Sequence, residues 1–358
     1  MVVCTHTRSS PLGDWRYLKL RAAIIGAGNV ASRHHLPAYR RIKNAQIVAV
    51  CDTDRTRAQR LARKFRIPRV YTDHDELFRR EQLDFVDVCT PVFTHMQICS
   101  RALTEGVNVL VEKPLCLTST EALALSRLCD SKGVSVCVAH NYRYLAPVMK
   151  TRELIEDDKI GGIMSIVGIM RSTPLLHLPE WTWDEAKSGG IFFEAALHLV
   201  DLQTLFCGEH RRVIGFTCTR DTEYHFVQAF EALIEFKSGA VGTLDINFLS
   251  TTASAELDIC GPAGNVRLLF FPPGMWRSQG FLTPITRTVG EGERVLNYVL
   301  ATLRGNYNSN YHVGLIRKFV ESIENRTDPP VNIAAALPTI RLLEELKEHA
   351  SATVEAQV

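Results

Sequence analysis

The chain has 358 residues, and its 41 Lys and Arg nearly balance its 39 Asp and Glu, giving a formal net charge of +2. A chain so close to neutrality lacks the basic field typical of proteins that bind nucleic acid or anionic membranes, so neither is an expected partner. The hydrophobic fraction of 46% and charged fraction of 22% are ordinary for a globular protein of about two domains.

No two of the ten cysteines have Cys-x-x-Cys spacing, which argues against a zinc site and against a disulfide scaffold. Most lie in apolar runs, as small buried side chains do in a reducing cytoplasm. Residues 1–18 are polar and are interpreted as an extension without the apolar core of a signal peptide. We expect a cytoplasmic protein with no metal and no membrane-spanning segment.

Short apolar runs alternate with helical patterns in the first part of the chain, residues 19–140. This order predicts a doubly wound α/β (Rossmann) domain, because strands of a parallel sheet are buried on both faces. The expected strands are 20–25, 46–51, 84–89, 107–111 and 134–139, and the expected helices are 29–42, 54–66, 95–105 and 118–131.

The pattern changes in residues 141–358, which are expected to form an α+β domain with a large, mainly antiparallel open sheet. Longer alternating runs, typical of antiparallel strands, replace the short apolar ones. The expected strands are 226–236, 240–248, 255–260 and 265–270, followed by helices 312–325 and 333–349.

Gly26, Gly28 and Ala31 fit the G-x-G-x-x-G/A pattern directly after the first expected strand. The first glycine permits a tight turn, the second lets the backbone approach a pyrophosphate, and the helix N-terminus faces the anion. Asn29 and Val30 complete this expected cofactor contact. Asp52 ends the next strand, where an acidic residue binds the ribose hydroxyls.

Asp52 also favours NAD over NADP, because a carboxylate repels the 2′-phosphate of NADP. Three arginines nearby, Arg33, Arg55 and Arg57, weaken that preference, although they also fit a solvated helix face. Arg57 is kept as a candidate cofactor contact.

Further motifs bring a known family into view: Thr90-Pro91 with His95, Glu112-Lys113-Pro114, and Gly189-Gly190 followed by Glu194, His198 and Asp201. Together with the glycine-rich turn, they resemble the glucose–fructose oxidoreductase / inositol dehydrogenase / rhizopine catabolism (Gfo/Idh/MocA) family from about residue 20 to 350. The resemblance implies NAD(P)-dependent hydride transfer to or from a secondary alcohol of a sugar, cyclitol or sugar derivative, including nucleotide sugars. It also implies a homodimer or homotetramer formed through the open face of the C-terminal sheet.

Lys113 and His198 are the expected catalytic pair, with Glu194 beside them. Lys113 follows a parallel strand at the edge where such sheets bind ligands, and its ammonium would stabilise negative charge on the reacting oxygen. His198 would accept the alcohol proton. Glu194, at i−4 on the same helix, would orient the imidazole, and Asp201 at i+3 is a second candidate for that role.

The remaining site residues are expected to contact the cofactor or the substrate. Thr90, Pro91, His95, Glu112, Lys113 and Asn141 would line the nicotinamide half of the cofactor, although His95 fits an ordinary helix residue equally well. Lys113, Arg171, Trp183, Glu194, His198 and Tyr311 would face the substrate, whereas Arg143 is expected to anchor the two domains to each other. The tryptophans of residues 171–187 fit an interdomain lid as well as a sugar-stacking surface.

The chain departs from the family pattern at four positions. Glu194 stands where the family has Asp, Ser188 and Ala196 replace glycines, and Val92 replaces Asn. Two alternative functions stay open: a redox glycosidase or lyase that acts through a transient keto-sugar, and a dinucleotide-binding regulator without catalysis.

Overall fold

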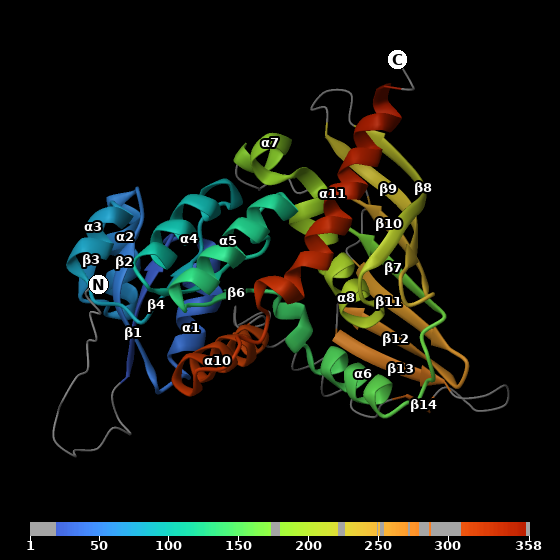
Figure 1. Ribbon diagram of the computed structural model, residues 1–358, viewed down its shortest axis with the longest axis horizontal. Helices are drawn as coiled ribbons and strands as arrows, with labels where there is room; N and C mark the ends of the chain where they lie inside the picture. Colours follow the sequence, from blue (N-terminus) through green and yellow to red (C-terminus); the bar gives the residue numbers. More distant parts are fainter. Residues whose placement is uncertain are drawn as a thin grey trace.

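The computed structural model describes residues 19–172, 180–220, 226–248, 250, 254–270, 273–278, 286–287 and 309–355. These residues build two sheets, each with its own helices, joined side by side (Figure 1). The expectation of a parallel sheet followed by a mainly antiparallel one is confirmed.

The first sheet has six parallel strands in the order β3-β2-β1-β4-β5-β6, which is the doubly wound order. All four residues of β4 are buried, because helices cover the sheet on both faces. The strands are β1 Leu20–Ile25, β2 Ala45–Cys51, β3 Arg69–Tyr71, β4 Phe85–Val88, β5 Asn108–Val111 and β6 Val136–Val138. The three-residue β3 is absent from the strands expected from the sequence.

The helices of this half begin and end at recognisable caps. Thr118 and Glu121 form a capping box at the start of α5, and Gly133 ends that helix in the left-handed conformation. The expected helix 29–42 is instead a π-helical turn, Ala31–His35, that continues into the short α1, Leu36–Tyr39. The others are α2 Arg55–Phe65, α3 His74–Arg80, α4 His95–Thr104 and α5 Ser119–Lys132.

The second sheet has eight strands in the order β14-β13-β12-β11-β7-β10-β9-β8. One neighbouring pair, β7 and β10, is parallel, and every other neighbouring pair is antiparallel. The strands are β7 Ser165–Arg171, β8 His210–Arg220, β9 Val227–Phe236, β10 Val241–Asn247, β11 Ser254–Gly261, β12 Gly264–Phe270, β13 Pro273–Ser278 and β14 Thr286–Arg287.

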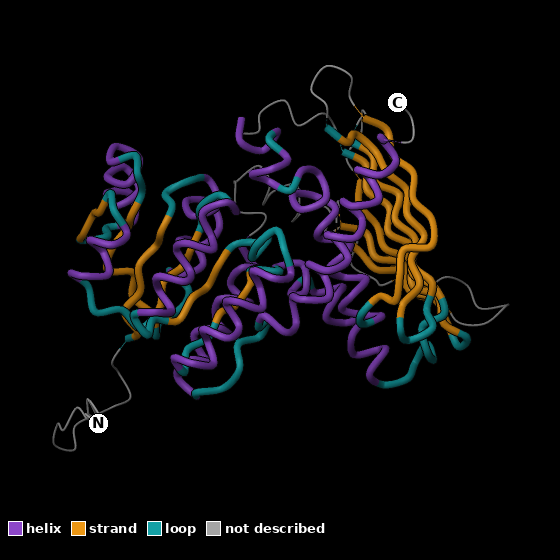
Figure 2. The backbone as a smooth tube through the Cα atoms, turned by 45° about the horizontal axis from the view of Figure 1, so that its top comes forward, coloured by secondary structure: helices purple, strands orange, loops and turns teal. Residues whose placement is uncertain are grey.

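Among the described residues, helices pack on one face of this sheet and leave its other face open (Figures 1 and 2). Side chains therefore alternate: in β11 every second residue, from Ala255 to Gly261, is buried under the helices. The open face carries the exposed apolar side chains of Leu233 and Val241. The covering elements include α6 Ala146–Glu156, α7 Glu185–Ser188 and α8 Leu197–Cys207.

One stretch, Glu185–Cys207, is long and apolar enough to cross a membrane by length and composition, and 67% of that window is buried inside the protein. Its α8 portion packs against β7 and α11. Its apolar character is therefore that of a core helix.

The two C-terminal helices connect the halves of the molecule. Phe319 of α10, Ser309–Asn325, packs edge-on against Phe85 in the core of the first sheet. The first turns of α11, Ile333–Glu355, belong to that same core, whereas Leu342 to Ala350 belong to the core of the second sheet. The C-terminal helices thus complete the core of the first half, although they follow the second half in the sequence.

The cysteines yield a first prediction, because none of the nine within the described residues forms a disulfide. Burial raises the pKa of Cys51, Cys116 and Cys207 to about 12, so their reactive thiolates are scarce at neutral pH. We expect a thiol reagent at pH 8 to label the native protein slowly and incompletely, and to label all ten cysteines after unfolding in guanidinium. Rapid labelling of the ten thiols in native protein would contradict the packing role.

Candidate functional site

The glycine-rich turn after β1 has the shape of a dinucleotide cradle. Gly26 has φ 98°, and a Cβ there would lie 2.6 Å from the carbonyl oxygen of Cys89, so glycine is required. At Gly28 a Cβ would meet nothing within 4 Å, which leaves open space where the pyrophosphate approaches the backbone. Ala31 is fully buried and lets the helix pack closely. These residues fit the cofactor that the motif implies.

Asp52 lies buried beside this turn, at the end of β2. Its carboxylate accepts hydrogen bonds from the backbone N–H groups of Ala27, at 2.7 Å, and Asp54, at 2.8 Å. Arg57 is half-exposed, and its Nη1 lies 3.7 Å from the Asp52 carboxylate. Asp52 therefore places a negative charge at the ribose end of the cradle and also holds the turn in shape.

Replacing Asp52 by asparagine gives a second prediction. We expect the ratio of kcat/KM with NADP to kcat/KM with NAD to rise by about tenfold, or 1.4 kcal/mol, because the charge that repels the 2′-phosphate is gone. Asp54→Asn is the matched control: it removes the same charge two residues away, and Asn still caps α2. Equal shifts in both variants would contradict a specific role of Asp52.

Lys113 follows β5 and reaches across to the other half of the molecule. Its Nζ donates hydrogen bonds to the backbone carbonyl of Glu194, at 2.8 Å, and to Glu194 Oε2, at 3.2 Å. An ammonium has three protons, and the described residues accept two of them. The third N–H is therefore available for a ligand. The peptide bond between Lys113 and Pro114 is cis.

Glu194 lies in a π-helical turn, Phe192–Ala196, that runs into α8. Wider turns rotate its side chain away from the face that an ordinary helix would give it. The expectation that Glu194 orients His198 is therefore wrong, because its carboxylate pairs with Lys113. Ser188, at a family glycine position, is buried and accepts a hydrogen bond from the Gly190 N–H at 2.9 Å.

His198 stacks on Tyr142, with ring centroids 4.0 Å apart and an interplanar angle of 14°. Burial, reinforced by the positive charge of Lys113, lowers the pKa of His198 to about 3. The imidazole is therefore neutral at physiological pH, and one of its ring nitrogens is an acceptor. Tyr142 was not among the expected site residues, and only its position after β6 could have indicated it.

Asp201 does not serve His198. The Arg143 guanidinium donates two hydrogen bonds to the Asp201 carboxylate, at 2.9 and 2.6 Å. Although burial opposes ionisation, Arg143 holds the pKa of Asp201 well below its usual range. This pair confirms the expected anchoring role of Arg143, because it joins the turn after β6 to α8.

The Thr90-Pro91 turn after β4 is shaped by its own chain. Thr94 Oγ1 donates to the Pro91 carbonyl at 2.7 Å, and Val92 is buried. His95 is 1% exposed, and each ring nitrogen lies 2.8 Å from a backbone carbonyl oxygen, of Thr90 or Pro114. His95 therefore joins the two turns and is not placed to contact the cofactor, contrary to one of the two expectations.

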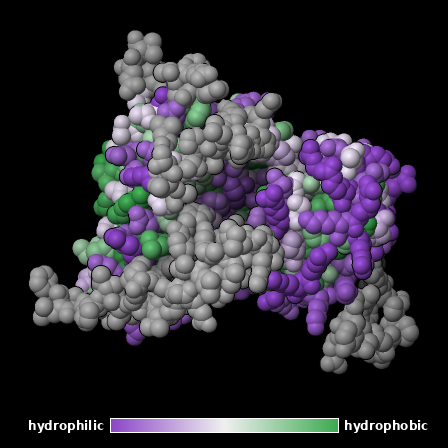
Figure 3. Space-filling view, turned by 180° about the vertical axis from the view of Figure 1, so that it is seen from behind, coloured by the Kyte–Doolittle hydropathy of each residue, from purple (hydrophilic) through white to green (hydrophobic). Residues whose placement is uncertain are grey.

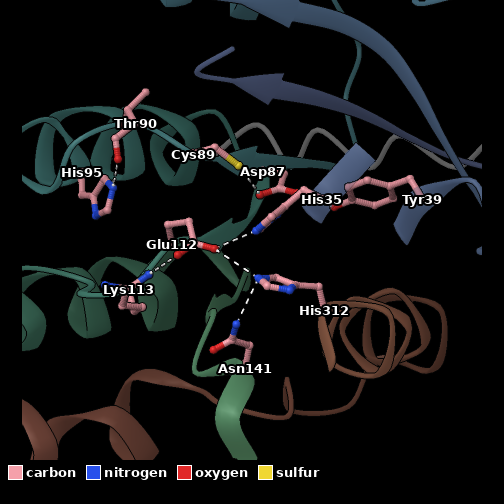
Figure 4. Close-up of polar contacts among 10 residues, drawn as sticks. All are labelled: His35, Tyr39, Asp87, Cys89, Thr90, His95, Glu112, Lys113, Asn141 and His312. Carbon is pink, nitrogen blue, oxygen red and sulfur yellow. Dashed lines mark hydrogen bonds and ion pairs between the residues drawn. The ribbon is translucent and has the colours of Figure 1, made fainter. Parts of the chain in front are cut away.

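Glu112 also differs from its expected role as a cofactor contact. Its Oε1 lies 2.7 Å from His35 Nε2, and its Oε2 accepts the Lys113 backbone N–H at 3.1 Å (Figure 4). Asn141 donates to His312 Nε2 at 3.1 Å, while its buried Oδ1 has no hydrogen-bond partner in the described part of the chain. Asn141 therefore stays a predicted cofactor contact. Both carboxylate oxygens of Glu112 are already hydrogen-bonded within the protein.

The expected substrate residues of the second half fare differently. Arg171 forms an ion pair with Asp245 on the open face of the second sheet, away from Lys113, so that expectation is wrong. The side chain of Trp183, like residues 173–179, lies outside the described residues. Tyr311 is partly buried against the second core and stays a prediction. Trp181 packs edge-on against Phe93 across the two halves.

The surface is hollowed where the two halves meet, and the hollow has a hydrophilic lining (Figure 3). Lys113, Glu194 and His198 come from opposite sides of this junction, β5 on one and α8 with its π-helical turn on the other. The arrangement offers a free ammonium proton, a carboxylate and a neutral imidazole at one place.

Comparison with known proteins agrees with both halves. Residues 20–140 match the family model described as "Oxidoreductase family, NAD-binding Rossmann fold", and residues 148–267 match the GFO/IDH/MocA C-terminal domain. The chain is 27% identical to D-apiose dehydrogenase of Paraburkholderia graminis, covering 70% of this chain and 68% of that protein. It is 28% identical to D-glucoside 3-dehydrogenase of Escherichia coli, covering 58% of each.

A solved structure with the same fold is an oxidoreductase from Agrobacterium radiobacter in complex with NAD+, L-tartaric acid and magnesium. The TM-score is 0.76 at 20% identity, over 93% of this chain and 96% of that one.

Proposed function

This chain belongs to the Gfo/Idh/MocA family of NAD-binding oxidoreductases, and we propose that it oxidises a secondary alcohol of a sugar, cyclitol or sugar derivative, or reduces the corresponding ketone. The observation that carries the proposal is the contact of Lys113 Nζ with Glu194, which brings the ammonium across the junction to the π-helical turn that leads into α8 and His198. Relatives that act on D-apiose and on D-glucosides support the sugar class.

The roles of the chain's own groups follow from their geometry. Bound NAD supplies the hydride acceptor. Neutral His198 takes the hydroxyl proton on a ring nitrogen, and the third N–H of Lys113 Nζ donates to the substrate oxygen as negative charge develops there. Glu194 holds the other two protons of Nζ and so aims the remaining one.

Asp52 and the glycine-rich turn would bind the cofactor, and NAD would bind more tightly than NADP. The proposed mechanism assigns no step to a metal ion. Within the described residues, three groups of His, Cys and acidic side chains are close enough to bind a metal, and none of these groups includes Lys113 or His198.

The test is a panel of polyols, free sugars, sugar acids and nucleotide sugars, each with NAD and with NADP, followed by the absorbance of the reduced cofactor. Net accumulation of NADH with at least one secondary alcohol is expected. Sugar turnover without net NADH would favour a redox glycosidase or lyase, and dinucleotide binding without turnover over the whole panel would favour a regulator.

We further propose that the chain forms a homodimer or homotetramer through the open face of the second sheet. Leu233 and Val241 leave apolar surface exposed there, between charged neighbours such as Glu231 and Asp245. Light scattering on the purified protein measures the assembly, and a monomer at micromolar concentration would contradict it.

A further inference from the structure

A network of buried charged side chains lies next to the Glu112-Lys113 turn (Figure 4). At its centre His35, fully buried in the π-helical turn after β1, lies between two carboxylates. Its Nδ1 is 2.7 Å from Asp87 Oδ2, and its Nε2 is 2.7 Å from Glu112 Oε1. A carboxylate can only accept, so two hydrogen bonds of this length to two carboxylates place a proton on each ring nitrogen and make His35 an imidazolium.

The surroundings of His35 agree with that charge. Burial alone opposes it, but Asp87 and the Cys89 side chain raise the pKa of His35 well above its ordinary value. Tyr39 donates to Asp87 at 2.9 Å and completes the outer end of the network. The other titratable groups facing the network are His312, whose Nε2 lies 4.0 Å from Glu112 Oε1, and His34, which stacks on His312.

Glu112 connects His35 to Lys113 in the candidate site. Burial by itself raises the pKa of Glu112, yet the hydrogen bond and charge of His35 lower it to about 2. Its second oxygen accepts the backbone N–H of Lys113 at 3.1 Å, and Lys113 Nζ reaches Glu194. The cation beside Glu112 is thus linked to the Lys113 residue by two contacts, and the Lys113 side chain carries the ammonium to the domain junction.

We propose that His35 is a positioning residue for the reaction: its imidazolium holds the Glu112 carboxylate, and Glu112 holds the backbone of Lys113 so that Nζ is aimed at the substrate oxygen. The inference rests on the proposed function of Lys113. Without a donor at the position of Nε2, Glu112 Oε1 is buried and loses its hydrogen bond from His35, so the carboxylate must turn towards water or take up a proton, and either change disturbs its hydrogen bond with the Lys113 N–H.

A network that only stabilises the fold would show the same contacts, so the test must separate the two ends of His35. The amide nitrogen of glutamine reaches about as far from the backbone as Nε2 of histidine, and that of asparagine about as far as Nδ1. His35→Gln therefore retains a donor towards Glu112 and loses Asp87, whereas His35→Asn retains a donor towards Asp87 and loses Glu112. Both variants remove the charge and one buried contact.

We expect His35→Asn to lower kcat by at least about tenfold relative to His35→Gln, with less than about a threefold change in the dissociation constant of NAD. Tyr39→Phe, which removes only the outer contact to Asp87, should keep kcat within about threefold of the parent. Thermal unfolding of all three variants corrects each rate for the folded fraction. Equal kcat in the two His35 variants, or an equal loss in Tyr39→Phe, would overturn the proposal.

Glu112→Gln keeps the inference testable if His35→Asn does not fold. The amide has the same size as the carboxylate but no charge for His35 to hold. We expect a loss of kcat of about tenfold with unchanged NAD affinity. Unchanged kcat, or a loss confined to NAD affinity, would overturn the proposal.

The same experiments include Lys113→Ala, which separates this inference from the proposed function. If that variant is inactive and the His35 pair shows no asymmetry, the positioning role is wrong while the function stands. If Lys113→Ala keeps full activity, the proposed function itself is wrong.

Discussion

Replacing Lys113 by alanine is expected to lower kcat by about 10²- to 10³-fold while NAD still binds. In the proposed mechanism the lost group is the ammonium whose free N–H faces the substrate oxygen, and that hydrogen bond strengthens as negative charge develops in the transition state. The carboxylate of Glu194 would also lose its cation and leave an uncompensated negative charge at the junction. Steady-state kinetics and NAD binding by fluorescence measure the two effects separately.

Lys187→Ala is the matched control for that substitution. Lys187 is an exposed residue of α7 whose Nζ lies 2.9 Å from the Asp184 carboxylate, so the variant removes a lysine ion pair elsewhere in the protein without touching the site. An exposed pair contributes at most about 1 kcal/mol, and kcat should not change. A similar loss of kcat in both variants would mean that the effect of Lys113 is not chemical.

Replacing His198 by asparagine is expected to lower kcat by about 10²- to 10⁴-fold, because the base that accepts the hydroxyl proton is gone. The pKa of about 3 has a further consequence. Since the imidazole is neutral from about pH 4 upwards, His198 should add no acidic limb to kcat/KM between pH 5 and 8 in the free enzyme.

The same shift links His198 to stability. A folded-state pKa of about 3 lies below the unfolded value of about 6.5, so the unfolded chain binds more protons between these two values. The contribution of His198 to the free energy of unfolding is therefore present above pH 6.5 and is lost as the pH falls towards 3. His198→Asn should flatten this part of the acid unfolding curve.

His210→Gln serves as the control for the histidine variant. His210 is also buried, but it lies in β8 and pairs with Glu345 of α11 at 2.8 Å, apart from the contacts of Lys113. We expect a lower melting temperature with kcat within about threefold of the parent. If His210→Gln lost as much kcat as His198→Asn, both effects would reflect damaged folding.

Local patterns predicted much of the fold because strands buried on both faces must be apolar at every position. Each of the five short apolar runs before residue 140 is a strand of the first sheet. Five strands escaped prediction, namely β3, β7, β8, β13 and β14, and two of these illustrate the opposite character. β3 has three residues, and its first, Arg69, is exposed; β8 is exposed or half-buried at most positions because it lies at the edge of the second sheet.

Part of the site was predicted and part was not, for a physical reason that Glu194 illustrates. Its side chain was expected to meet His198 because four residues separate them, a rule that holds for an α-helix. The π-helical turn changes that geometry, and Glu194 meets Lys113, 81 residues earlier in the chain. Arg171 was misplaced similarly, since a strand residue faces one side or the other according to register alone.

What the sequence by itself determined is the order of the elements and the residues that end them. Gly26, Asp52 and Lys113 stand at the carboxyl ends of parallel strands, and such ends share one edge whatever the rest of the fold does. Only the tertiary structure decided the partners of the buried charges. His35 meets Glu112 across 77 residues, and Asn141 meets His312 across 171. Those pairings arise because a buried charge must find an opposite charge or a hydrogen-bond partner, and packing alone sets which one lies within reach.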